Sequence, residues 1–207
     1  KRFSAVAISL FLSITFPISS ANALADGTVN CGGGGTFTIS SNVVTGNTSC
    51  SGAVAIPEGA TSIASNAFKN LSTITTLSIP STVTSIGGSA FEGATSLSSV
   101  SFSEGVTTIG NFAFNRTTSL SSINLPNSVT SIGYSSFAAS GLTSVVLGNG
   151  LTAIGSNAFR ENISLTSITL GLGLTTIGTS AFFGATAISS FNFLGSQPSV
   201  QMAAFFL

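Results

Sequence analysis

Charged residues, histidine and tryptophan are scarce or absent in this chain. Only 5% of the 207 residues are charged, although about 25% is usual for a globular domain. Histidine and tryptophan do not occur at all. The chain therefore lacks the commonest general base and the commonest neutral metal ligand. This composition argues against most hydrolytic enzymes and most metal centres.

The low charge does not indicate disorder. Disordered chains combine low hydrophobicity with high net charge, whereas 43% of these residues are apolar and 17 are Phe. The polar remainder is rich in Ser and Thr. We predict a folded chain, long enough to bury a substantial core, whose polar surface consists mainly of hydroxyl groups.

The N-terminal segment resembles an export signal. Lys1 and Arg2 precede an apolar run at 3–18, and small residues around Ala25 follow it. A basic start, a short apolar stretch and an Ala-x-Ala site are typical of a signal peptide. We predict a signal peptide at residues 1–25.

A membrane anchor is the alternative for this segment. The apolar run is interrupted by Ser9, Ser13 and Pro17, and it is shorter than the roughly 20 residues that a span needs. We therefore expect cleavage before Asp26 and a mature chain, without a membrane span, that is secreted or held at the cell surface.

The mature chain would carry few charges of either sign. Its basic and acidic residues are Lys69, Arg116 and Arg160 against Asp26, Glu58, Glu92, Glu104 and Glu161, a net charge of 3 − 5 = −2. Nucleic-acid binding proteins present basic patches. Nucleic acid is therefore excluded as an expected partner.

Residues 26–52 predict a small β cap. Phe37 and Ile39 alternate with hydroxyl residues, a second strand is expected at 43–45, and Gly46-Asn47 is expected to turn the chain. The glycine run at 32–35 lacks the residues of a phosphate-binding loop and predicts a turn.

The two cysteines, Cys31 and Cys50, lie within this cap. A disulfide between them is expected in an exported protein and would contribute about 3 kcal/mol. Two free thiols are the alternative. Two sulfurs alone are too few ligands for a metal site, and no cofactor motif is present.

From Ala53 onward the sequence repeats with a period of 22 or 23 residues. One column is aromatic: Phe68, Phe91, Phe114, Phe137, Phe159, Phe182 and Phe205. Five residues before each stands an aliphatic residue: Ile63, Ile86, Ile109, Ile132, Ile154, Ile177 and Val200. Two coincident columns indicate structural repeats.

Each repeat also contains an L-x-x-L-x-L triplet, for example Leu120, Ile123 and Leu125. This triplet at a fixed period of 20 to 29 residues is the mark of a leucine-rich repeat. One unit cannot form a core alone but can do so when stacked on its neighbours. We predict a leucine-rich-repeat solenoid of about 23-residue units at 53–207, mainly β with short turns or helical pieces, comprising about six full repeats and a partial one.

One repeat is shorter than the others. Phe and the following Leu are six residues apart in most units, but Phe137 and Leu142 are five apart. Deletions are tolerated in loops, so the intervening 138–141 is predicted to be an outer turn.

The repeats resemble a known family. The strings at 79–91 and 125–137, with the pattern L-P-x-S-V-T-S-I-G-x-x-x-F, are similar to the BspA-type leucine-rich repeats of bacterial and protist surface proteins. The resemblance covers roughly 53–207. It implies an exported or surface-exposed protein. Some members of the family adhere to host or extracellular molecules, but membership alone does not imply adhesion by this chain.

The x residues of each triplet are expected to face outward from one sheet. This candidate binding face comprises Thr75, Thr76, Ser78, Ser98, Ser99, Ser101, Ser121, Ser122, Asn124, Thr143, Ser144, Val146, Thr166, Ser167, Thr169, Ser189, Ser190 and Asn192. Three interpretations compete: solubility and β-propensity without a ligand, a broad adhesive surface, and an array that orders water or ice. Val146 and Asn124 interrupt the hydroxyl rows and weigh against the third.

Catalysis is not expected. Glu92 and Glu104 occupy different columns of neighbouring repeats, so nothing pairs them as acid and base. The abundant serines have no histidine partner, and Lys69 has no supporting motif for a Ser-Lys dyad.

The sequence thus predicts a non-catalytic interaction or adhesion module whose partner is an extracellular protein or glycan. A structural spacer that displays another domain is the alternative. The last unit stops at Leu207 without a polar closing repeat, and solenoids need capped ends. We therefore expect a truncated chain or an end-to-end contact at the C-terminus.

Overall fold

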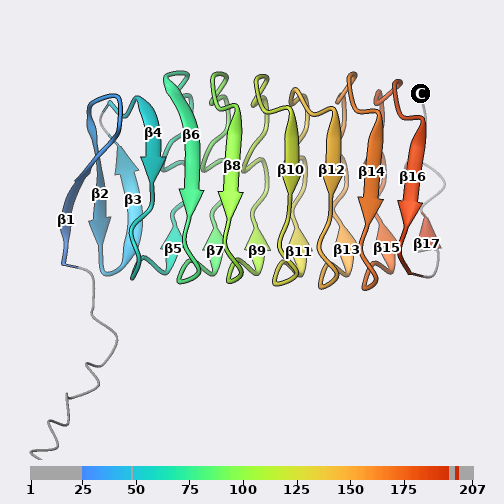
Figure 1. The fold of residues 1–207 in the computed structure, drawn as a ribbon, viewed down its shortest axis with the longest axis horizontal. Coiled ribbons are helices and arrows are strands. Elements are labelled where there is room, and N and C mark those ends of the chain that lie inside the picture. Colours follow the sequence, from blue (N-terminus) through green and yellow to red (C-terminus); the bar gives the residue numbers. More distant parts are fainter. Residues whose placement is uncertain (1–24, 48, 196–198, 201–207) are drawn as a thin grey trace, which may run out of the picture.

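Figure 1 shows a computed structural model of the chain, which describes residues 25–47, 49–195 and 199–200. The chain winds into a solenoid with a front layer of longer strands and a back layer of short strands. The predicted leucine-rich-repeat solenoid is confirmed. The signal peptide expected at 1–25 lies, except for its last residue, outside the described residues, as do Phe205 and the C-terminal end of the chain.

The back layer is one continuous sheet of ten strands. In spatial order these are β1 (Gly27–Asn30), β2 (Thr36–Ser40), β3 (Val43–Asn47), β5 (Ser62–Ile63), β7 (Ser85–Ile86), β9 (Thr108–Ile109), β11 (Ser131–Ile132), β13 (Ala153–Ile154), β15 (Thr176–Ile177) and β17 (Ser199–Val200). From β3 to β17 the pairing is parallel, one strand per turn of the solenoid.

The front layer consists of two parallel sheets. The first contains β4 (Gly52–Ala55), β6 (Ile74–Ile79) and β8 (Ser99–Phe102), and the second contains β10 (Ser122–Asn124), β12 (Ser144–Val146), β14 (Ser167–Leu170) and β16 (Ser190–Phe193). Because the apolar columns repeat, each strand pairs its residues with their equivalents one turn away, as in Leu77 with Val100 and Ile168 with Phe191.

The front layer is interrupted between β8 and β10, which do not pair. In Figure 1 these two strands stand visibly farther apart than their neighbours, while β9 and β11 remain paired behind them. The interruption coincides with Phe102, which replaces the Ile79 and Leu125 of the adjacent turns and is only half-buried. Its ring meets Phe114 edge-on, with centroids 6.2 Å apart.

The N-terminal end of the solenoid is closed by an antiparallel β1–β2–β3 unit. Phe37 and Ile39 of β2 are buried and join the core. The expected turn at Gly46-Asn47 is wrong, because β3 continues to Asn47 and carries the pairing with β2. The sequence signal for a turn there was outweighed by pairing with β2, in which Gly46 lies opposite Thr38 and Asn47 opposite Phe37.

The predicted disulfide is confirmed. Cys31 and Cys50 are joined across 19 residues with their Cα atoms 5.5 Å apart, and both side chains are buried. The bond ties the turn after β1 to the segment that leads into β4. It therefore fastens the back layer to the front layer at the N-terminal end.

A row of stacked phenylalanines forms the centre of the core. From Phe68 to Phe182 neighbouring rings lie 5.1–5.6 Å apart between centroids, and their planes differ by 3–10°. Parallel rings at this separation are offset-stacked, a favoured aromatic geometry. Phe37 makes an edge-on contact with Phe68, and Phe191 makes one with Phe182. The repeated Phe column is thus a continuous internal stack.

A turn segment connects each short back strand to the next front strand, and the row of these segments forms what we call the turn face. No helix occurs among the described residues, so the helical pieces considered above are turns. Each segment has two residues with left-handed backbone. These are Asn66, Ser89, Phe112, Ser135, Asn157 and Ser180 in the first column, and Asn70, Gly93, Arg116, Ala139, Glu161 and Gly184 in the second. Left-handed residues end any α-helical run, which explains the absence of helix.

The short repeat is accommodated in one turn segment. Residues pair 22 apart both in the front layer, where Ser122 meets Ser144, and in the back layer, where Ser131 meets Ala153. The missing residue therefore lies between Phe137 and the next front strand, in the outer turn predicted from the sequence.

Candidate functional site

The outward side chains of the front strands form one surface across both front sheets, which we call the sheet face. All 18 residues predicted for it lie there: 15 are exposed, and Ser144, Ser167 and Thr169 are half-buried. They form three columns along the solenoid axis, because each L-x-x-L-x-L unit contributes three outward positions. The surface carries neither charge nor aromatic rings, and its only large apolar residue is Val146.

The first of these columns has a structural role. Ser98, Thr143, Thr166 and Ser189 each donate a side-chain hydrogen bond to the backbone carbonyl of the residue one repeat earlier, at 2.9–3.3 Å. These hydroxyl groups therefore add hydrogen bonds between adjacent turns of the solenoid. Among the described residues, the second and third columns have no such hydrogen bonds within the protein. These two columns are the part of the sheet face that is available to a ligand.

A second hydroxyl ladder runs beside the short back strands. Thr84, Thr107, Thr130, Thr152 and Thr175 each donate to a carbonyl of the preceding turn at 3.0–3.3 Å. Part of the repeated Ser and Thr pattern therefore stabilises the stack of repeats rather than contacting a partner.

The carboxylates that were weighed as catalytic groups are each engaged separately. Glu104 accepts hydrogen bonds from the backbone N–H groups of Asn127 and Ser128, at 3.1 and 2.9 Å. Glu92 pairs with Lys69, whose Nζ lies 3.0 Å from its carboxylate. Both glutamates bridge neighbouring turns.

The pKa of Glu92 lies below its ordinary value. Partial burial alone raises this pKa, but hydrogen bonds from Ser89 and Lys69 and the positive charges of Lys69 and Arg116 outweigh it. The group therefore stays ionised at neutral pH and is poorly suited to act as a general acid.

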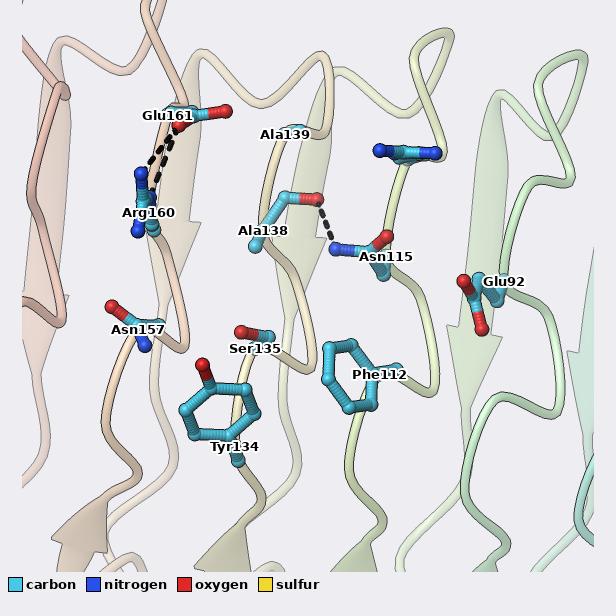
Figure 2. A pocket seen from close by; sticks show the side chains of 11 residues that line it. Glu92, Phe112, Asn115, Tyr134, Ser135, Ala138, Ala139, Asn157, Arg160 and Glu161 are labelled. Carbon is cyan, nitrogen blue, oxygen red and sulfur yellow. Dashed lines mark hydrogen bonds and ion pairs between the residues drawn. The ribbon is translucent and has the colours of Figure 1, made fainter.

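A hollow of about 320 Å³ lies on the turn face. Figure 2 shows Ala138 and Ala139 between Asn115 on one neighbouring turn segment and Arg160 and Glu161 on the other. The two alanines occupy columns in which both neighbours carry larger polar side chains. The hollow thus arises because the short repeat places small residues between large ones.

An aromatic pair borders this hollow. Phe112 and Tyr134 lie on adjacent turn segments, with ring centroids 5.3 Å apart and planes at 70°. The two residues are 36% and 44% exposed, although every Phe of the central stack is buried. Figure 2 shows the two rings side by side at one edge of the hollow.

The backbone of Phe112 is strained. Its φ is +59°, in a column otherwise occupied by Asn and Ser. Left-handed geometry costs a residue with a side chain roughly 1–2 kcal/mol, and Asn tolerates it best. A bulky residue at positive φ is a genuine outlier, and such outliers cluster at functional sites.

The basic residues gather on the turn face. Lys69, Arg116 and Arg160, all the basic residues of the described chain, stand in two adjacent columns of it. Lys69 is paired with Glu92, and Arg160 is paired with Glu161 at 3.0 Å. Among the described residues no carboxylate lies within ion-pair distance of Arg116. The lining of the hollow therefore carries two positive charges, Arg116 and Arg160, and two negative charges, Glu92 and Glu161.

A buried polar ladder lies beneath the turn face and was missed in the sequence. Thr117 and Ser140 both donate to the carbonyl of Phe114, and Asn162 donates to those of Phe137 and Phe159, all at 2.8–2.9 Å. Other repeats have Leu71, Ala94 or Ala185 at this position, whose own backbone N–H reaches the Phe carbonyl. The only sign of this ladder in the sequence is that Thr117, Ser140 and Asn162 occupy the same column, three residues after each Phe.

The described residues contain no group of three or more His, Cys, Asp or Glu that could hold a metal ion. None of their segments forms a helix with the length and hydropathy needed to cross a bilayer.

Comparisons with known proteins identify similarity to leucine-rich repeat proteins. The family described as "BspA type Leucine rich repeat region" matches residues 38–160 and 90–206, in six copies. The solved leucine-rich repeat protein of T. pallidum is 28% identical, with a TM-score of 0.72, over 84% of this chain and 82% of that one. A leucine-rich repeat protein from Bacteroides ovatus is 24% identical, with a TM-score of 0.59, over 81% of this chain and 51% of that chain. The comparison with curated proteins found no match.

Proposed function

This chain belongs to the BspA-type leucine-rich repeat family, and from that premise we propose that it is an adhesive module that binds an extracellular protein or glycan through its sheet face. Proteins of this family are typically surface interaction modules, and the repeat family and solenoid fold are typically non-catalytic. We further propose that the chain is exported, with cleavage before Asp26, and acts outside the cell without catalytic activity.

One observation supports the sheet face as the contact surface. Its second and third columns present side chains that make no hydrogen bond to the part of the protein that the structure describes, and each column contributes one such position per turn. The first column is already occupied by the ladder between turns. The exposed groups are therefore more numerous than the stability of the solenoid requires, and they are arranged on an extended surface of the kind that solenoids use for binding.

The chemistry of this face predicts weak individual contacts. Binding energy usually comes from buried aromatic and arginine anchors, and the sheet face has neither. Neutral hydroxyl and amide groups form hydrogen bonds with a small net gain, because they must first give up water. Useful adhesion would then depend on many copies acting together at the cell surface.

A multivalent binding assay tests this proposal. The purified chain, displayed in many copies on beads, is applied to arrays of glycans and extracellular-matrix proteins. The double variant Ser99→Glu/Ser122→Glu adds charge to the second column and is expected to reduce binding at least tenfold. The matched control, Ser81→Glu/Ser103→Glu, adds the same charge at exposed positions on the turns that follow β6 and β8, and it should bind normally.

Two results would contradict the proposal. Uniform absence of binding by the multivalent wild-type chain would favour a structural spacer. Equal loss of binding in the test and control variants would mean that added charge, rather than the sheet face, determines the signal.

A further inference from the structure

We propose that the hollow on the turn face is a second binding site, specific for a saccharide that carries a carboxylate. This site lies on a different surface from the sheet face, and it stands whether or not the sheet face binds. Its parts are the aromatic pair Phe112 and Tyr134, the guanidinium of Arg116, and the amides of Asn115 and Asn157, all of which line the hollow.

The aromatic pair is not explained by the stability of the fold. The ring of Phe112 lies outside the central stack, is 36% exposed, and requires a left-handed backbone that other repeats give to Asn or Ser. Tyr134 occupies a column where the neighbouring turns have Asn111 and Ser156. Two exposed rings placed edge to face offer an apolar surface to a ligand. A sugar ring has a matching apolar face made of its C–H groups.

The shape of the hollow favours a small ligand. Its volume of about 320 Å³ is at the lower end of the range for small-molecule sites, about 300–1,000 Å³. The small side chains of Ala138 and Ala139 form its base, and the neighbouring turn segments rise on both sides (Figure 2). This space accommodates one or two sugar rings but not a helix.

Arg116 is the group in the hollow that favours an anion. Glu92 and Glu161 also line the hollow, but they are paired with Lys69 and Arg160 at 3.0 Å. The charge of Arg116 lowers the pKa of Glu92, yet among the described residues no carboxylate lies within ion-pair distance of its guanidinium. A guanidinium binds a carboxylate through two parallel hydrogen bonds. The amide of Asn157 and the hydroxyl of Tyr134 are then available for sugar hydroxyls. Nδ2 of Asn115 already donates to the carbonyl of Ala138 at 3.2 Å, so this amide would contribute through its oxygen.

The backbone of the turn face argues against an extended peptide. The N–H groups of Phe112, Arg116 and Ala139 donate to carbonyls of the next turn at 2.8–2.9 Å. Peptides that add a strand need a free backbone edge, and these donors are already used. Recognition must therefore rely on side chains, which suits the dispersed polar groups of a saccharide.

The test is calorimetric titration of the soluble chain with a panel of oligosaccharides. Each ligand ends in a hexuronic acid or N-acetylneuraminic acid, and each is paired with its carboxyl-reduced counterpart. We expect at least one acidic ligand to bind with a millimolar or lower Kd, and its reduced counterpart to bind at least tenfold more weakly. An acidic peptide of similar charge is titrated in parallel.

Three variants connect the signal to the site. Arg116→Asn, Phe112→Asn and Tyr134→Ser introduce residue types found at equivalent positions of other repeats, and each should weaken binding at least fivefold. Phe112→Asn relieves the strained backbone, so its urea midpoint should not fall, which separates loss of binding from loss of folding. The sheet-face variant Ser99→Glu/Ser122→Glu should bind the acidic saccharide normally.

Each alternative outcome overturns the assignment. Failure of every acidic saccharide, equal binding of the reduced counterparts, or insensitivity to Arg116→Asn would exclude the proposed site. Binding of the acidic peptide alone, with the same dependence on the three variants, would show that the hollow takes a peptide instead.

Discussion

Asn162 provides a direct test of the buried polar ladder. Its Nδ2 donates to the carbonyls of Phe137 and Phe159, both at 2.8 Å, and its Oδ1 has no partner. Asn162→Asp keeps the shape of the side chain but replaces the double donor with a carboxylate directed at two carbonyl oxygens. Asn162→Ala removes both the donor and the unpaired oxygen. It also introduces the residue that Ala94 and Ala185 provide in other turns.

The expected magnitudes differ between the two variants. In Asn162→Ala the backbone N–H can replace one bond, as it does at Ala94, so the loss is about 1 kcal/mol for the remaining hydrogen bond. In Asn162→Asp, burial and the two carbonyls disfavour the charged form and raise the pKa of the new carboxyl. A rise of two to three units above the usual ~3.9 would reduce stability at pH 7 by about 3 to 4 kcal/mol.

The sign of the pH dependence is the decisive feature. In the Asn162→Asp variant the folded-state pKa of the introduced carboxyl lies above the unfolded value, so the folded form binds the proton more tightly. Near pH 3.5 the protonated carboxyl can replace only one of the two donors, so the variant should resemble Asn162→Ala there. It should lose further stability as the pH rises from about 4 through the folded-state pKa. The measurement is urea unfolding followed by circular dichroism from pH 3.5 to 7, with wild type and Asn162→Ala as references. A loss that does not change with pH, or a larger loss for Asn162→Ala at pH 7, would refute the role assigned to the two Nδ2 bonds.

Four further predictions concern stability and are measured by urea or thermal unfolding. Ser136→Ala should stabilise the chain by about 1 kcal/mol, because Oγ of Ser136 is buried without a partner; a loss would reveal a missed hydrogen bond. Replacing Cys31 and Cys50 with Ser should cost about 3 kcal/mol, and reductant should have the same effect on the wild type only. Phe114→Leu removes two stacked pairs, worth about 1–3 kcal/mol beyond the lost area, whereas Phe102→Leu, with a half-buried ring, should cost less. Because the pKa of Glu92 is lowered, its pair with Lys69 stabilises the folded chain above the ordinary glutamate pKa. This contribution is lost as the pH falls through the lowered pKa. In Lys69→Met the loss of unfolding free energy at acid pH should be smaller than in the wild type, by less than about 1 kcal/mol. An unchanged loss would show that other groups cause it.

The periodic part of the fold could be predicted because the same pattern of apolar residues recurs in every repeat. The Phe and Ile columns fix which side chains face inward, and stacking one turn on the next then fixes the register. The location of the deleted residue followed from the same columns, since the spacing changes only between Phe137 and Leu142.

The cap was predicted less completely, because its signals are local. The strand at Gly27–Asn30 was not identified, since Gly27 and Asn30 are poor strand formers and its pairing with β2 provides the stability. The continuation of β3 through Gly46-Asn47 has the same explanation. In both places a tertiary partner outweighed the local preference.

The two candidate surfaces differ in how far the sequence could reveal them. The outward positions of the front strands follow from the triplet, so the sheet face could be described residue by residue. The hollow depends on differences between repeats: Ala138 and Ala139 matter only because their neighbours are large, and Phe112 matters only because its backbone is left-handed. The pattern that the repeats share does not show such differences between them.

The interruption between β8 and β10 has a mechanical consequence. Three front strands precede it and four follow it, while the back sheet crosses it without a break. A rod that is continuous on one side and divided on the other is most compliant at the division. The phenylalanine stack also crosses it, through Phe91 and Phe114. A bending force should therefore open the front layer between β8 and β10 before it separates paired front strands.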